Sequence, residues 1–340
     1  MKKLLFLTAL IILNGSLFAQ TLPCANDSLQ YRYSLADPNY HSQRQSYIER
    51  INDYRQNPPT GSFIDYGDPS TALDLGCRTT RYVIPVVIHI NHDTLVQVTD
   101  TQVYQQLQIL NDAFLPFNVQ FCLAKKRPNG IGFNGINRFS SIHNPTDNES
   151  ANQMVNLTNV AYYNPSKYLN IYVVKEILEN GQPSGYIGYN SNYPFQNYLD
   201  GIVLLHTRFG DSTSCYDCGP LAGGSRGKVL VHEVGHYLGL FHIFEGSCTG
   251  GNTAGTCDKE GDLCCDTRPV LGPLGSCNID TSIRSCLNYH LSIPENRSNY
   301  MEYSGEACMT NFSPDQVSIM HASLELYRSG LIRTENVIIS

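Results

Sequence analysis

The sequence predicts a mixed α/β fold (an α+β domain built on a mixed sheet), and three observations lead to it. Residues 81–90, RYVIPVVIHI, form a β-branched apolar run typical of a buried strand. Residues 99–114, TDTQVYQQLQILNDAF, carry apolar side chains at helical spacing behind a Thr/Asp start. Strands that alternate with a helix along the chain indicate a mixed sheet. The further candidate strands are residues 119–123, 169–174, 186–189 and 202–205.

The first 19 residues have the pattern of a secretory signal peptide. Lys2 and Lys3 precede an apolar run at residues 4–13, and the small residue Ala19 closes the segment. The run is shorter than the ~20 residues that a membrane-spanning helix needs, which favours export over anchoring. We therefore expect a secreted, extracellular protein without a membrane anchor.

Charge and cysteine content agree with export. The 340 residues include 23 Lys+Arg and 30 Asp+Glu, a net charge of −7, and loss of the leader would remove two further lysines. An acidic balance argues against a nucleic-acid partner. The 12 cysteines all follow the leader, which fits an oxidising compartment. We expect a monomer.

Residues 20–78 read as an accessory, removable segment. They are polar and poor in long apolar runs, and prolines and glycines punctuate their second half, which predicts a loose linker. A short helix is expected at residues 43–55.

The remaining elements follow from local signals. Pro85 suggests that the strand at 81–90 is an edge strand or carries a bulge. Residues 231–244 are expected to be helical, and a cysteine- and glycine-rich coil follows to about residue 300. Ser313 and Gln316 form a capping box with proline between them, which opens a last helix that Gly330 should stop.

The stretch VHEVGHYLGLFHIF at 231–244 contains three of the ten histidines. His232 and His236 are four residues apart, so on a helix they lie on one face, one turn above the other. Gly239 permits the left-handed turn after which His242 can swing back toward the other two. Three neutral imidazoles leave one exchangeable position on a tetrahedral zinc ion, as in catalytic zinc sites.

Two other interpretations of this stretch compete with catalytic zinc. The chance expectation for H-E-x-x-H-x-x-G-x-x-H in a chain of this length is on the order of 10⁻⁴, which argues against unrelated surface or core histidines. A structural zinc site would draw on the cysteines, and it would not need Glu233.

We predict that Glu233 takes a proton from the attacking water and gives it to the leaving amine in peptide hydrolysis. The substrates are then proteins or peptides. The alternative is an inactive, zinc-stabilised binding or adhesion module.

With these residues in view, the sequence resembles a known family. HEVGHYLGLFH is similar to the zinc-binding motif of the metzincins, and NYMEYSGEACM at 299–309 resembles their methionine turn. Within the metzincins, the chain resembles the pappalysins, and especially their short secreted bacterial members. The resemblance covers roughly residues 81–331 and is strongest from 223 to 312.

The resemblance implies a fold and two further roles. It implies a catalytic domain at 79–340, with an upper subdomain of about 79–239 and a lower one of about 240–340. The upper part would be a twisted mixed sheet with a backing helix and the active-site helix above the cleft, and the lower part an irregular, disulfide-rich region. Met301 would pack beneath the metal without binding it, and Tyr303 would stabilise the tetrahedral intermediate.

The resemblance also implies a calcium site. Gly261, Asp262, Asp266 and Thr267 resemble the family's GD…DT loop, and carboxylate and carbonyl oxygens suit a hard cation. Asp262, Asp266 and Thr267 are the candidate ligands, and a solvated acidic turn is the alternative. This chain departs from the pattern by placing two cysteines between the aspartates.

Several cysteine roles are implied by family position. Cys24, near the start of the segment 20–78, would be the fourth zinc ligand of a latent zymogen, although an ordinary disulfide is the alternative; Arg78 and Arg81 are candidate cleavage points for activation. The pairs implied by the resemblance are Cys248–Cys286 and Cys277–Cys308. The other pairings stay open, because spacing alone does not fix connectivity: Cys215–Cys218, Cys77–Cys122, and Cys257 with Cys264 or Cys265.

Overall fold

A computed structural model describes eleven stretches of the chain. The predicted leader at 1–19 and the junction around Arg78 and Arg81 lie outside them. No helix among these stretches is long and apolar enough to cross a membrane. The described residues are 24–58, 82–92, 97–140, 163–190, 193–194, 201–211, 225–248, 256–275, 277, 286 and 296–332.

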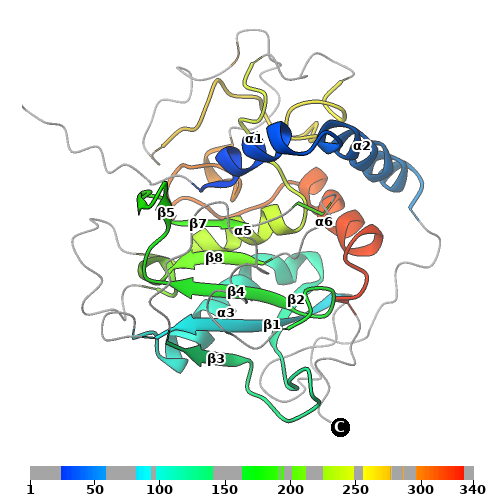
Figure 1. Cartoon of the computed structure of the whole chain (residues 1–340). Coiled ribbons are helices and arrows are strands. Elements are labelled where there is room, and N and C mark those ends of the chain that lie inside the picture. Colours follow the sequence, from blue (N-terminus) through cyan, green and yellow to red (C-terminus); the bar gives the residue numbers. More distant parts are fainter. Residues whose placement is uncertain are drawn as a thin grey trace, which may run out of the picture.

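A mixed sheet forms the body of the molecule (Figure 1). Its strand order is β2-β1-β4-β8-β7, and β3 pairs with β1 beyond the end of β2. All pairs are parallel except β7 with β8, so β7 is an antiparallel outer strand. The strands are β1 (Tyr82–Asn91), β2 (Val119–Leu123), β3 (Ile136–Phe139), β4 (Leu169–Val174), β7 (Gly188–Asn190) and β8 (Ile202–Leu205). The predicted mixed α/β fold is confirmed.

The expectation that Pro85 marks an edge strand or a bulge was wrong, since β1 pairs with β2 and β4 without a skipped residue. Every residue of β1 is buried, and the strand has neighbours on both sides. Pro85 is tolerated because pairing with β4 begins only at Val86, one residue later. The missing N–H of proline therefore costs no hydrogen bond to β4.

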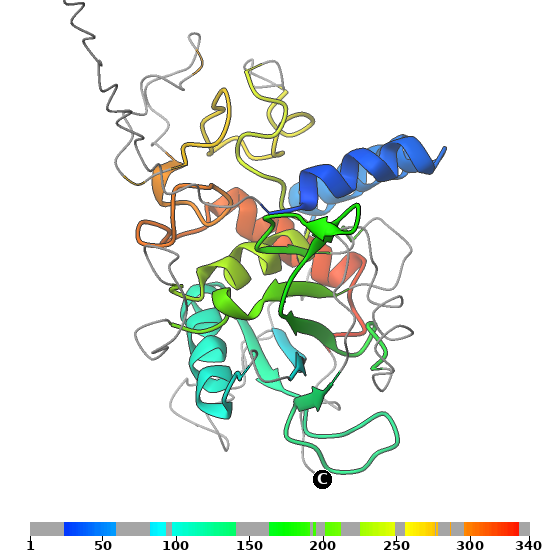
Figure 2. The same ribbon diagram turned by 60° about the vertical axis from the view of Figure 1, so that its left-hand side comes forward.

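Two helices pack together on one face of the sheet, as Figure 2 shows. Helix α3 (Asp100–Phe114) starts with a capping box between Thr99 and Gln102, as its Thr/Asp start indicated. Its buried side, which includes Leu110 and Phe114, lies against β2 and against helix α5 (Lys228–Tyr237). Helix α5 also packs on β7 and β8, so the outer strand and this helix lie side by side.

The N-terminal segment is more structured than the sequence indicated. The helix expected at 43–55 is confirmed as α2 (Tyr40–Gln56), which extends a little further at its N-terminal end, and a second helix, α1 (Asn26–Ala36), was not predicted. Helix α2 buries Tyr47 and Ile51 in the main core and packs on α6 (Pro314–Leu326). Both helices lie across the end of the molecule that carries α5 and α6 (Figure 1).

The remaining differences concern the boundaries of predicted elements and short elements that were not predicted. The capping box at Ser313 opens α6 as predicted, but the helix ends at Leu326, four residues before Gly330. The strand expected at 186–189 is β7 at Gly188–Asn190. Several short elements were not predicted from the sequence: β3, the hairpin of β5 (Leu178–Glu179) and β6 (Gln182–Pro183), and 3-10 turns at Leu115–Phe117, His206–Arg208 and Asn296–Ser298.

One histidine of the sheet makes stability depend on pH. His89 on β1 is fully buried, with Nε2 2.9 Å from Asn170 Oδ1 and Nδ1 3.1 Å from Asn137 Nδ2. A neutral ring with the proton on Nε2 satisfies both amides. Burial lowers the pKa of His89 to about 4, whereas an unfolded histidine has a pKa of about 6.5. As the pH falls from 6.5 to 4, the unfolded chain takes up a proton that the folded chain refuses, so folding is weakened.

We expect His89→Gln to flatten the pH dependence of unfolding in that window. At about 1.4 kcal/mol per pKa unit, the wild-type chain should lose on the order of 3 kcal/mol through this group by pH 4. Denaturant titrations of both proteins at pH 7, 5.5 and 4 measure the difference. His92→Gln, at an exposed position just beyond β1, is the control. Equal losses in the His89 variant and the wild type would contradict the prediction.

Candidate active site

Helix α5 brings His232 and His236 onto one buried face, one turn apart. The helix ends at Tyr237, so the expectation of a helix through residue 244 was wrong. Gly239 follows with φ of +96°, a left-handed conformation that glycine adopts without strain. This turn reverses the chain and returns His242 to the other two histidines.

Two glycines of this segment leave no room for a side chain. A Cβ at Gly239 would overlap Tyr47 Oη and Ser323 Oγ, which meet at this turn. A Cβ at Gly235, inside α5, would overlap the sulfur of Met301. Met301 therefore packs directly against the helix that carries the histidines.

The three histidines converge on one point. The Nε2 atoms lie 3.1 Å apart for His232 and His236, 3.2 Å for His232 and His242, and 3.0 Å for His236 and His242. Tetrahedral zinc with nitrogens at about 2.0–2.1 Å would hold them roughly 3.3 Å apart. Cys24 Sγ joins the same cluster, since the four ligand atoms lie within 4.8 Å of one another.

The other nitrogen of each ring explains why the Nε2 atoms are available. Nδ1 of His232 lies 2.7 Å from the Tyr300 carbonyl, and Nδ1 of His236 lies 2.8 Å from the Leu240 carbonyl. Nδ1 of His242 lies 2.8 Å from Asp27 Oδ1. These acceptors favour protonated Nδ1, so every Nε2 lone pair is free to bind a cation. Burial also lowers the pKa of His232 to about 3 and keeps that ring neutral. The donor set therefore fits zinc.

Glu233 and Tyr303 flank this cluster. Glu233 is fully buried, and its Oε2 accepts a hydrogen bond from Cys24 Sγ at 3.5 Å. Burial raises the pKa of the Glu233 carboxyl to about 8. The ring of Tyr303 lies 4.9 Å from that of His242, and its hydroxyl donates to the carbonyl of Cys24 at 3.4 Å. The structure thus brings together all the residues to which the sequence analysis assigned catalysis or zinc binding.

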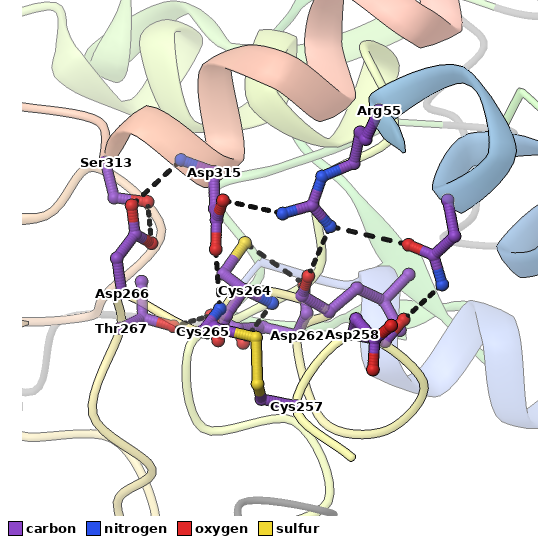
Figure 3. The surroundings of a disulfide bond; sticks show 12 residues. Arg55, Cys257, Asp258, Asp262, Cys264, Cys265, Asp266, Thr267, Ser313 and Asp315 are labelled. Atoms are coloured by element: carbon purple, nitrogen blue, oxygen red, sulfur yellow. Dashed lines mark hydrogen bonds and ion pairs between the residues drawn. A yellow bond between two sulfur atoms is a disulfide. The ribbon is translucent and has the colours of Figure 1, made fainter. Parts of the chain in front are cut away.

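The side chains of the candidate calcium ligands are hydrogen-bonded to other groups of the protein (Figure 3). Thr267 Oγ1 donates to Asp262 Oδ2 at 2.6 Å, so these two candidates are adjacent. Asp266 turns toward α6, where it accepts hydrogen bonds from Ser313 Oγ at 2.6 Å and from the N–H of Asp315 at 2.9 Å. Burial raises the pKa of Asp262 to about 7. The three candidates are therefore not gathered around one point.

Three disulfides lie in the C-terminal region. Two are the pairs that the resemblance implied, and the third resolves the open alternative for Cys257. Cys264, the other member of the doublet, is buried and free. Cys122 is disulfide-bonded, but its suggested partner Cys77 lies outside the described residues, as do Cys215 and Cys218. The three bonds are Cys248–Cys286, Cys257–Cys265 and Cys277–Cys308.

Comparison with known proteins agrees with this site. The family model of peptidase M43, described as pregnancy-associated plasma protein-A, matches residues 152–325, which is more than half of the chain. The chain belongs to the peptidase M43 family. The zinc site of this M43 peptidase is the cluster of His232, His236 and His242.

Individual relatives support the same assignment. An extracellular metalloprotease of Pyricularia oryzae is 26% identical over 260 residues, which cover 75% of this chain and 80% of that protein. Mature mirolysin of Tannerella forsythia, in complex with a cleaved peptide, is 26% identical with a TM-score of 0.53 and covers 74% of this chain and 98% of its own. A promirolysin mutant of the same organism, 22% identical with a TM-score of 0.64, covers 92% and 97% and shares the fold. This M43 peptidase is an extracellular zinc metalloprotease that acts on proteins.

Three polar residues of the M43 peptidase's site escaped the sequence analysis. Asp27 contacts His242, and the hydroxyl of Tyr193 lies 2.9 Å from Nδ1 of His236. The Glu306 carboxylate accepts a hydrogen bond from the N–H of Lys228 at the start of α5, and the two residues are 78 positions apart in sequence. No local spacing signals such partners, because each reaches the site from a distant segment.

Proposed function

We propose that this chain is a latent zymogen of a short secreted bacterial M43 endopeptidase, in which Glu233 is the general base and acid. The observation that carries the proposal is the convergence of three Nε2 atoms beside a buried carboxylate. The N-terminal leader of the chain and the similarity of the chain to a Tannerella forsythia protein support the proposed bacterial origin.

The chain's own residues account for the hydrolysis of a peptide bond. Zinc, when bound by the three histidines, lowers the pKa of a water and polarises the substrate carbonyl. Glu233 accepts a proton from the attacking water at its carboxylate and passes it to the leaving amine nitrogen as the C–N bond breaks. Tyr303 Oη donates a hydrogen bond to the oxyanion that develops on the carbonyl oxygen. No covalent acyl-enzyme is formed.

The proposed latency rests on the N-terminal segment. Cys24 Sγ stands where a fourth ligand belongs, and a thiolate binds zinc well enough to exclude the catalytic water. The next residues line the cleft: the N–H of Ala25 donates to the Gly188 carbonyl on the outer strand at 3.1 Å. Asp27 then contacts His242. These contacts occupy the outer strand and the metal site together, so the segment lies where we expect a substrate to bind.

Helix α2 supports the same proposal by tying the segment to the domain. Arg55 forms an ion pair with Asp315 at 2.6 Å (Figure 3). It also donates to the Leu263 carbonyl at 2.9 Å. Tyr47 Oη donates to the Gly239 carbonyl at 3.0 Å. We assign residues 20–78 as the prosegment and 79–340 as the catalytic domain, with subdomains that meet near residue 239.

A calcium ion at Asp262, Asp266 and Thr267 stays part of the proposal. Asp262 and Thr267 are adjacent, and Asp266 would have to leave its contacts with α6 to join them. Isothermal titration of the purified protein with calcium tests it. The expectation of a monomer also stays a prediction.

The rival function is an inactive binding module that keeps zinc for stability. Such a module would have no use for Glu233, which is nevertheless buried beside the histidines. We expect the processed protein to digest casein, to lose this activity with a zinc chelator such as 1,10-phenanthroline, and to regain it when zinc is returned. The non-chelating isomer 1,7-phenanthroline is the control. A processed, zinc-loaded protein that leaves casein and gelatin intact would favour the binding module.

A further inference from the structure

The start of the zinc-binding helix lacks a cap of its own. Helix α5 begins after Gly227, which has φ of +69° and no side chain to accept from the first N–H groups. A side chain at this position would be strained by the positive φ, and its Cβ would come within 2.7 Å of Ile109 Cδ1 and 3.0 Å of Gln106 Oε1. The free N–H groups at a helix start need acceptors from elsewhere.

Glu306 supplies this acceptor from the methionine turn. Its Oε2 accepts hydrogen bonds from the N–H of Arg226 at 2.9 Å and from the N–H of Lys228 at 2.8 Å. Its Oε1 lies 3.7 Å from a guanidinium nitrogen of Arg208, and the carboxylate side chain is only 12% exposed. A buried carboxylate at the N-terminus of a helix interacts favourably with the helix dipole.

A second contact joins the same two segments one helical turn further on. The carbonyl of Tyr300 accepts from Nδ1 of His232 at 2.7 Å. Tyr303 lies midway in sequence between Tyr300 and Glu306, three residues from each. Both flanking residues are thus fixed to α5, one at a zinc ligand and one at the first turn. The turn that carries the phenol cannot move along the helix without breaking one of these contacts.

We propose that Glu306 is a positioning residue for the hydrolysis reaction, which holds the Tyr303 phenol in register with the zinc ligands by capping helix α5. The inference rests on the proposed role of Tyr303 in stabilising the oxyanion. Glu306 itself touches neither the metal-binding atoms nor the cleft residues Cys24 and Glu233. It acts through the backbone of the turn.

A double-mutant cycle with Tyr303→Phe tests the proposal on the processed, zinc-loaded enzyme. Because displacements of about 1 Å in a site can cost up to 10²-fold in rate, we expect Glu306→Gln to lower kcat about tenfold and Glu306→Ala more. KM and zinc stoichiometry should not change. In the Tyr303→Phe background, the same Glu306 substitutions should change kcat less than about twofold, since the phenol that they misplace is already absent.

A second readout does not depend on activity. Amide hydrogen exchange at residues 226–230 should quicken in both Glu306 variants, with the Ala variant the faster. Asp100→Asn, which removes an ion-paired carboxylate from the first turn of α3, is the control and should change neither kcat nor exchange at 226–230. Because glutamine keeps the size of the side chain, we expect Glu306→Gln to fold even if Glu306→Ala does not.

Two results would overturn the proposal. The first is a Glu306 substitution that lowers kcat by the same factor in the wild-type and the Tyr303→Phe backgrounds. The second is a loss of kcat that is proportional to a loss of bound zinc. Wild-type hydrolysis, measured first, separates these results from a failure of the proposed function itself. An inactive wild-type enzyme would refute the proteolytic mechanism, while the exchange experiment would still show whether Glu306 caps the helix.

Discussion

Replacing Glu233 by glutamine should remove nearly all proteolysis while zinc stays bound and the fold stays intact. The amide has the size and polarity of the carboxylate but cannot accept the proton of the attacking water. General base catalysis contributes about 10² to 10⁴ in rate, and here one residue performs both proton transfers. We expect kcat/KM on a quenched fluorescent peptide to fall by at least about 10³-fold. The three histidines, which do not depend on Glu233 for their hydrogen bonds, should keep the metal.

The control for Glu233 is a second carboxylate close to the same histidines. Glu245 follows His242 by three residues and pairs with Arg44 of the N-terminal segment, at 3.5 Å. Glu245→Gln should leave kcat/KM of the processed enzyme within about threefold of the wild type, because its partner Arg44 leaves with the prosegment and the Glu245 carboxylate makes none of the hydrogen bonds that orient the three histidine rings. Metal analysis and thermal unfolding of both variants exclude loss of zinc or of structure. A Glu233→Gln enzyme with wild-type turnover would rule out its role as the base.

The zinc ligands could be predicted from the sequence because their geometry is local. A spacing of four residues places His232 and His236 on one helical face, and a glycine permits the turn that returns His242. The structure has φ of +96° at Gly239, as the turn requires. The same locality explains why the Thr/Asp start at residue 99 and the capping box at Ser313 marked the starts of α3 and α6 correctly.

What the sequence could not predict depends on contacts between distant segments. Glu306 was unreadable because its partners are backbone N–H groups 78 and 80 positions away. Helix α1 was missed because its pattern of apolar residues is weak, and Leu29 is buried against residues of β4, β7 and β8. The prediction from Pro85 was wrong for a related reason. Whether proline is tolerated in a strand depends on where the neighbouring strand begins, which only the assembled sheet determines.

Replacing Cys24 by alanine should raise the activity of the unprocessed chain. Cys24 is 5% exposed, and its sulfur belongs to the cluster formed by the three histidines. Without the thiolate, water can enter the fourth position, and the free energy that holds the segment over the site falls. Each 1.4 kcal/mol lost in this way increases the open fraction tenfold. We expect an increase of at least about tenfold in the initial rate on a short fluorescent peptide, with intact mass showing that the chain is still uncut.

Activation of this variant should be incomplete, and the reason lies in the contacts that remain. Asp27 still reaches His242, and α2 stays buried against α6 with Arg55 paired to Asp315. Adding Asp27→Ala to Cys24→Ala should therefore raise the rate further. Cys264→Ala is the matched control, because Cys264 is the other described cysteine that is buried and free, yet it lies in the 256–275 loop.

Cobalt substitution measures the thiolate contact without reference to turnover. The unprocessed wild-type chain loaded with Co²⁺ should show thiolate-to-metal charge-transfer absorption in the near ultraviolet, and Cys264→Ala should keep it. Cys24→Ala and the processed enzyme should both lack it, because in each the sulfur has left a site that the three imidazoles still hold. If the band persists without Cys24, or if the unprocessed wild-type chain never shows it, then the zinc–thiolate bond is not what keeps the zymogen latent.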